Sequence, residues 1–219
     1  MPITASVGGA KKEPVPAGSH HAICYGVVAV GTQPSNIPEY KPQKKVMLLW
    51  ELPQERGDFG DKVNVPRGIS KRYTLSMNPK ASLRKDLESW RGKPFSDADA
   101  AKFDIGALIG ANLMINVVHT EKGGATYANV AALMPLPKGM SKMTNENPSL
   151  YFNLEEAIND AFVGGHKDIE FPATMSPWLV EDCKKSGEYL SFLGKVNTKP
   201  VAPAPAPKQA SLVTEEVPF

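Results

Sequence analysis

The stretch NPKASLRKDLESWRG, residues 78–92, predicts one amphipathic helix in the middle of a chain that otherwise predicts strands. Asn78 followed by Pro79 is typical of a helix start, and Gly92 is typical of a helix stop. The apolar positions follow helical spacing and form one stripe: Leu83, Leu87 and Trp90. The remaining surface is predicted to carry the basic residues Lys80, Arg84, Lys85 and Arg91. We expect the stripe to plug the end of a barrel.

Five apolar runs rich in β-forming residues flank this helix. Three precede it, at 20–31, 44–53 and 69–76, and two follow it, at 111–120 and 126–136. The glycine pair in EKGG, residues 121–124, predicts a hairpin turn between the last two. The intervening stretches 32–43 and 54–68 are polar and predict two long loops, and SDADAAKF, 96–103, predicts a short acidic helix.

This order of elements favours a mainly β fold with helices, namely a five-stranded oligonucleotide-binding (OB) barrel with its helix between strands three and four. Another small five-stranded α+β domain fits the same periodicity. The domain boundaries that we expect are a flexible arm at 1–18, the barrel at 19–145, a helical extension at 146–195, and a Pro/Ala-rich linker with an acidic tip at 196–219. Within the extension, 149–162 and 176–194 each predict one helix.

Charge is distributed unevenly along the chain. Residues 20–145 carry a net charge of +6, and residues 146–219 carry −5. A basic body joined to an acidic tail region is the asymmetry expected of nucleic-acid binders, although plain solvation of two surfaces gives the same pattern.

Motifs of catalysis are missing from the sequence. It has no GxxxxGK[ST] phosphate loop, no GxGxxG after a strand and no GxSxG elbow. His20, His21 and Cys24 have the spacing of half a metal site and lack a second half, and the aspartates of the predicted loops are placed as solvent-facing charges. We therefore expect a binding protein with no catalytic activity, metal or cofactor.

Targeting signals are also missing. The N-terminus has no apolar signal region, no apolar run approaches about 18 residues, and Cys24 and Cys183 are too few for a disulfide framework. These features predict a cytoplasmic protein without a membrane partner.

Basic and aromatic residues are interleaved on the predicted second and third strands and on the loops beside them. A site that binds single strands without reading sequence needs cations for the phosphates and rings for the bases. The candidate residues are Tyr40, Lys41, Lys44, Lys45, Trp50, Arg67, Lys71, Arg72, Tyr73, Lys122 and Tyr127. Trp50 and Tyr73 share their faces with aliphatic residues, so filling the barrel is as good an interpretation of them as stacking on a base.

The sequence closes on TEEVPF after a proline-rich spacer. Phe219 offers a ring and a carboxylate to a pocket with a basic rim, and the acidic pair attracts such a rim over a distance. The residues predicted to contact partner enzymes are Glu215, Glu216, Val217, Pro218 and Phe219. The simpler interpretation is a disordered chain end that has no function.

TEEVPF also resembles the acidic tip of bacterial single-stranded DNA-binding proteins. Four runs, at 25–33, 46–53, 69–95 and 115–140, resemble a family of bacteriophage single-stranded DNA-binding proteins with an OB fold. The longest, ISKRYTLSMNPKASLRKDLESWRGKPF, is the most specific of them.

The resemblance implies that the protein coats single-stranded DNA during phage replication, recombination or repair in the bacterial cytoplasm, without catalysis. It also implies recruitment of replication and recombination enzymes through the tip, and self-association remains open. Two other functions remain alternatives. One is an adaptor or decoy that engages host enzymes through TEEVPF without DNA, and the other is an annealing or recombination-mediator protein.

Overall fold

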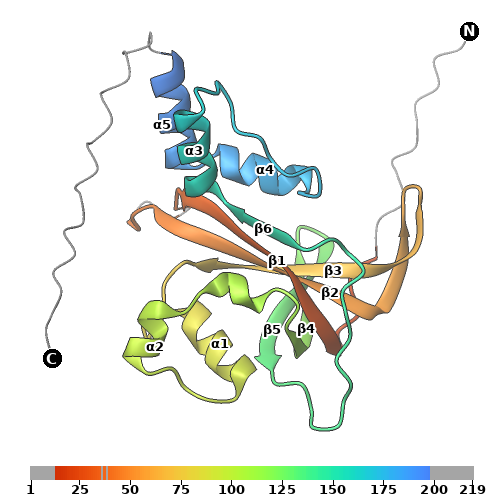
Figure 1. The fold of residues 1–219 in the computed structure, drawn as a ribbon. Helices are drawn as coiled ribbons and strands as arrows, with labels where there is room; N and C mark the ends of the chain where they lie inside the picture. The colour runs from red at the N-terminus through yellow and green to blue at the C-terminus, as the bar shows by residue number, and fades with distance from the viewer. Residues whose placement is uncertain (1–12, 36, 38, 198–219) are drawn as a thin grey trace, which may run out of the picture.

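The protein is mainly β, with a curled five-stranded antiparallel half-barrel and a few helices (Figure 1). The computed structural model describes residues 13–35, 37 and 39–197. The half-barrel contains β1 (Gly18–Gln33), β2 (Gln43–Phe59), β3 (Lys62–Thr74), β4 (Asn112–Lys122) and β5 (Ala125–Met134). They pair in the order β3-β2-β1-β4-β5, and β3 also lies against β5. The five predicted strands and the hairpin at the glycine pair are therefore confirmed.

β2 and β3 are longer than predicted. Residues 54–68, predicted to be a polar loop, extend both strands into a projecting hairpin in which Arg56 pairs with Pro66 and Phe59 with Lys62 (Figure 1). Polar side chains stabilise this hairpin locally, because Arg56 Nε donates to Asn64 O at 2.8 Å and Asn64 N donates to Asp58 Oδ1 at 2.8 Å. A polar composition is compatible with strands here because both faces of the hairpin tip are exposed to water.

The predicted central helix is present as α1 (Ser82–Arg91), between β3 and β4, and its first helical residue lies three positions after Pro79. Asn78 stabilises a turn before the helix, where its Oδ1 accepts from Lys80 N at 3.0 Å, and Ala81 occupies the N-cap position. Gly92 ends the helix with a φ of 69°. The stripe of Leu83, Leu87 and Trp90 is buried, as predicted. A short α2 (Asp97–Lys102) and a 3₁₀ turn, η1 (Ile105–Leu108), follow.

Arg84 of α1 corrects the prediction of a uniformly basic outer face. Its guanidinium is buried, where it donates to Phe95 O at 2.8 Å and lies 3.0 Å from both Glu88 and Asp97. It thereby ties the segment after the helix back onto α1, because Nη1 donates to Asp97 and Nη2 to Phe95 O in that segment.

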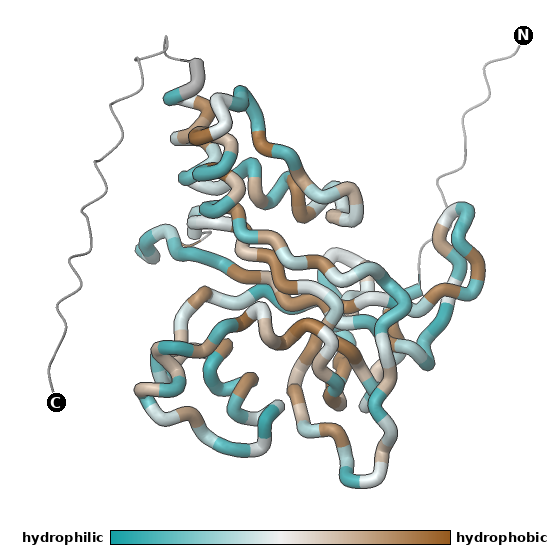
Figure 2. Tube along the Cα trace, in the orientation of Figure 1, coloured by the Kyte–Doolittle hydropathy of each residue, from teal (hydrophilic) through white to brown (hydrophobic). Residues whose placement is uncertain are grey.

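Two apolar clusters lie on opposite faces of β1 and β2. The interior cluster, between the sheet and α1, contains Leu48, Trp50 and Tyr73. The outer cluster contains Met47 and Leu49, which alternate with the interior residues along β2. Figure 2 shows hydrophobic positions concentrated along the central strands and hydrophilic positions on the hairpin and peripheral loops.

The C-terminal extension covers the outer cluster (Figure 1). It contains β6 (Leu150–Asn153), which pairs in parallel with β1, followed by α3 (Leu154–Val163), α4 (Pro177–Lys184) and α5 (Gly187–Asn197). The prediction of two helices was wrong in two respects: residues 150–153 form a strand, and the second helix is broken between α4 and α5. No helix in the described ranges has the length and apolar character needed to cross a membrane.

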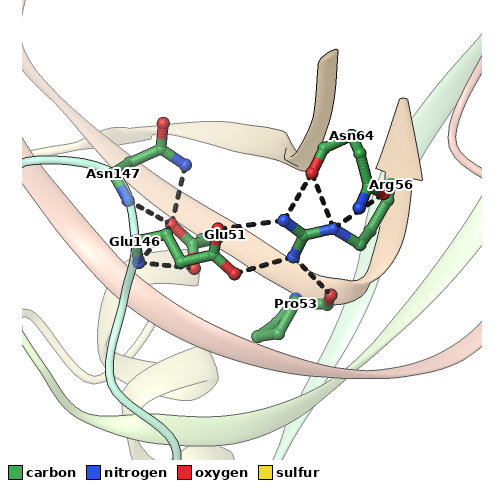
Figure 3. Close-up of polar contacts among 6 residues, drawn as sticks. All are labelled: Glu51, Pro53, Arg56, Asn64, Glu146 and Asn147. Carbon is green, nitrogen blue, oxygen red and sulfur yellow. Dashed lines mark hydrogen bonds and ion pairs between the residues drawn. The ribbon is translucent and has the colours of Figure 1, made fainter. Parts of the chain in front are cut away.

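The segment between β5 and β6 is attached to β2 by a buried carboxylate (Figure 3). Glu51 is fully buried and accepts hydrogen bonds from Glu146 N at 2.9 Å and from both nitrogens of Asn147 at 2.7 Å. Arg56 pairs with the Glu146 carboxylate at 2.7 Å beside it. These contacts fix where the extension begins relative to the barrel.

Candidate nucleic-acid interface

The predicted stacking residues Trp50 and Tyr73 point into the barrel. Trp50 is 0% exposed and Tyr73 is 2% exposed, and both belong to the interior cluster. The Tyr73 hydroxyl donates to Asp86 of α1 at 2.8 Å, and burial together with that carboxylate raises its pKa strongly. Their assignment to DNA binding is therefore corrected: strand alternation places both rings on the same face as Ile69 and Leu48, where α1 covers them.

A groove of about 550 Å³ lies where β2, β3 and β5 meet α4 and the segment before β1. Four rings and one guanidinium line it: Tyr25, Phe59, Arg67, Tyr127 and Trp178. We name these five residues the aromatic groove. Tyr127 is 52% exposed and Trp178 is 48% exposed, so both rings have faces available to a ligand.

Arg67 is positioned in this groove by backbone oxygens. Its Nη1 donates to Glu13 O at 2.9 Å and to Pro14 O at 3.2 Å, and no ion pair of Arg67 occurs in the described ranges. These bonds also hold residues 13–15 against the barrel, and Val15 is buried there, although the sequence predicts a flexible arm to residue 18. Arg67 thus places a cation with no described carboxylate partner beside exposed rings. Such a combination suits single-stranded nucleic acid, in which the cation meets a phosphate and the rings meet bases.

A second, smaller cavity of about 230 Å³ lies at the other end of β3. Three cations line it, namely Lys41, Lys45 and Arg72, which we name the basic pocket. Lys45 Nζ donates to Gln43 Oε1 at 2.9 Å and to Thr74 Oγ1 at 2.7 Å. Burial, followed by the charge of Arg72, lowers the Lys45 pKa, and none of the described carboxylates forms an ion pair with Lys45.

Carboxylates pair with three of the predicted cations, and one of these three is Arg72 of the basic pocket. Lys44 pairs with Glu155 of α3 at 2.5 Å, and this hydrogen bond raises the pKa of Lys44. Arg72 pairs with Asp182 of α4. Lys71, on the interior face, pairs with Asp86 at 2.7 Å and lies over the Tyr73 ring. The acidic extension thus lies directly on the basic face that the sequence predicts for nucleic acid.

The predicted residues therefore separate into groups. Arg67 and Tyr127 meet in the aromatic groove, and Lys41, Lys45 and Arg72 meet in the basic pocket. Tyr40 is exposed in the loop after β1, and Lys122 is exposed at the hairpin between β4 and β5. Neither lines one of these two cavities. The predicted tip, residues 215–219, lies outside the described residues.

Sequence reasoning missed three residues of the aromatic groove. Tyr25 and Phe59 lie in segments that were predicted as a plain strand and a loop, and nothing local to them indicates a groove. Trp178 had a usable signal, because Leu179 and Cys183 define the apolar stripe of α4 and Trp178 falls outside it. Tryptophan is enriched at binding interfaces, so a tryptophan outside the buried stripe of a short helix favours a binding surface.

The histidines near the start of β1 have other contacts. His20 lies 3.1 Å from Glu55, and His21 lies 2.8 Å from Asn112 Oδ1. In the described part of the chain, no three His, Cys, Asp or Glu side chains are grouped to hold a metal ion. Scans against protein-family models and against curated proteins return no match to this chain.

Proposed function

We propose that the protein binds single-stranded DNA with little sequence preference, along the length of β3. The observation that carries this proposal is that β3 contributes to both cavities, through Arg67 in the aromatic groove and Arg72 in the basic pocket. Arg67 and Arg72 are five positions apart, which is about 17 Å along a strand. A single strand that followed β3 would meet rings for its bases at one end and cations for its phosphates at the other.

We also propose that the half-barrel is an OB barrel. The helix between β3 and β4 and the contact of β3 with β5 support this assignment. OB folds bind oligonucleotides on the face of strands two and three and on the loops beside them. Lys41 lies in the loop between β1 and β2, and Tyr127 lies close after the turn between β4 and β5. Both positions support the proposal, because they lie in or beside loops that such a fold uses to bind its ligand.

In this proposal the protein acts in replication, recombination or repair of phage DNA in a bacterial cytoplasm. The support for that setting is the resemblance of residues 20–140 and of the TEEVPF tip. The tip would recruit partner enzymes while the barrel holds the strand, and binding would need no catalytic group.

A fluorescence-anisotropy titration tests the proposal. Labelled oligo-dT, a matching duplex and a matching RNA are titrated with the full chain and with a chain lacking residues 211–219, at two salt concentrations. We expect tight, salt-sensitive binding of oligo-dT over the duplex, retained after truncation. The absence of binding by both chains would overturn the proposal and leave the adaptor function. DNA incubated with Mg²⁺ should remain uncleaved.

A further inference from the structure

Helix α4 contacts residues of both cavities. Trp178, in its first turn, lines the aromatic groove, and Asp182, one turn later, pairs with Arg72 of the basic pocket. Leu179 and Cys183, each one residue further along, bury the adjacent side of the helix in the outer cluster. Because these apolar contacts hold the helix on the sheet, the carboxylate of Asp182 lies where a phosphate approaching Arg72 would have to lie.

The Asp182 backbone and its carboxylate are held by different groups. Gln33 Nε2 donates to the backbone carbonyl of Asp182 at 2.9 Å and to Val30 O at 2.7 Å, which anchors this point of α4 to β1. The carboxylate has two cationic neighbours, Arg72 and, at 4.0 Å, Lys185. It can therefore turn from Arg72 towards Lys185 without moving the helix.

We infer that the basic pocket is a binding site for one DNA phosphodiester, and that the Asp182 carboxylate pairs with Arg72 of this pocket until the phosphate displaces it. The inference rests on the proposed function, because it names how that site binds its ligand. Charge favours the exchange: Lys41 and Lys45 add two cations that the carboxylate does not engage in the described structure, and a phosphate in the pocket meets all three. The Arg72 side chain is 41% exposed and the Asp182 side chain 15% exposed, so a phosphate can approach the pair from the arginine side.

The first test replaces the competing carboxylate. Asp182→Asn leaves Arg72 free, and we expect it to tighten oligo-dT binding about five- to tenfold at low salt and to steepen the salt dependence by about 0.7 in log–log slope. Glu181→Gln is the matched control, since it removes the same charge one residue earlier on α4, from an exposed carboxylate that pairs with Lys184. We expect less than a twofold change in the control.

The second test acts on the alternative partner and leaves the Arg72 pair intact. Lys185→Ala removes the cation that receives the displaced carboxylate. Lys184→Ala is the control, because it removes the same charge from the neighbouring position. We expect Lys185→Ala to weaken oligo-dT binding about threefold more than Lys184→Ala does. This arm keeps the inference testable if Asp182→Asn fails to fold, and a urea titration of each variant establishes folding.

The outcomes separate the two proposals. Failure of the wild-type chain and of every variant to bind oligo-dT overturns the proposed function. Binding by the wild-type chain with equal affinities for Asp182→Asn and Glu181→Gln, or with equal affinities for the two lysine variants, overturns the phosphate exchange and leaves the proposed function standing.

Discussion

The carboxylate of Glu51 accepts hydrogen bonds from both the backbone and the side-chain nitrogen of Asn147, 96 residues later, each at 2.7 Å (Figure 3). Glu51 projects from β2 on the side of Met47 and Leu49, and Asn147 lies in the segment that leads from β5 to β6. One buried side chain therefore decides where the C-terminal extension starts. Since that extension carries Trp178 and Asp182, the candidate interface depends on this contact.

Replacing Glu51 with Ala should destabilise the protein by about 2–4 kcal/mol, because the donors of residues 146 and 147 lose a buried acceptor. Urea unfolding measures the loss. Gln54→Ala, an exposed change on the same strand, is the control and should stay within about 0.5 kcal/mol. An unchanged midpoint for Glu51→Ala would show that the contact does not anchor the extension.

Gly31→Ala should loosen the extension from β1. An added Cβ would lie 2.8 Å from Ser186 Cβ and 2.9 Å from Leu154 Cδ2, and φ at this position is +74°. Gly60→Ala is the control that separates the cost of the backbone conformation from the cost of the steric clash, because Gly60 has a φ of +62° and open space around it. It should lower the free energy of unfolding by about 1–2 kcal/mol through backbone conformation alone. We expect Gly31→Ala to lower the free energy of unfolding by about 1–3 kcal/mol more than Gly60→Ala does, because of the clash. It should also raise hydrogen exchange in α3 and α5, whereas equal losses in the two variants would argue against tight docking.

Removing an exposed ring from the aromatic groove should weaken oligo-dT binding. We expect Trp178→Ala and Tyr127→Ala each to cost about 1–3 kcal/mol of binding free energy, or about 5- to 150-fold in Kd, because in the proposed complex each ring stacks on a base. Phe162→Ala removes a comparably exposed ring from α3, outside the groove, and should leave Kd unchanged. Anisotropy titration at fixed salt measures the Kd of all three variants. Equal effects in the three variants would contradict the proposal that the aromatic groove binds bases.

The lysines of the basic pocket should determine part of the salt dependence. Replacing Lys41 and Lys45 together with Ala should lower the slope of log Kobs against log salt by about 1.4, since each phosphate contact to a single strand contributes about 0.7. Lys85 and Lys138 are exposed lysines that line neither cavity, and their double Ala variant is the control for net charge. A slope that falls equally in both variants would assign no phosphate to the pocket.

Both thiols should be unreactive in the folded protein. Burial raises the pKa of Cys24 and of Cys183 to about 12, so at pH 8 a thiol reagent should label neither until urea is added. The unfolded chain loses these protons near pH 9 and the folded chain keeps them, so folding stability should fall as pH rises from about 9 towards 12. Above pH 10, Tyr189, whose pKa is also raised to about 12, adds to this loss. Labelling at pH 8 without urea would contradict the burial of the thiols.

Local patterns in the sequence were sufficient for most elements of the fold. The spacing of Leu83, Leu87 and Trp90 predicted α1, and the glycine pair at 123–124 predicted the β4–β5 turn, because both signals lie within a few residues of one another. The hairpin at 54–68 and the strand β6 escaped this reasoning. β6 forms its backbone hydrogen bonds with β1, which is distant in the sequence, and the hairpin strands are polar. Local composition therefore does not predict either of them.

The sequence by itself determined which residues of each strand share a face, and it identified cations and rings on β2 and β3. It did not determine which face is covered, because a period of two is the same whichever side faces the core. Tertiary structure decided that Trp50 and Tyr73 fill the barrel, and that α4 brings Trp178 to the aromatic groove and Asp182 to Arg72. The physical reason is that a pair such as Arg72 and Asp182, 110 residues apart, forms only when the extension packs its apolar side on the outer face of the sheet.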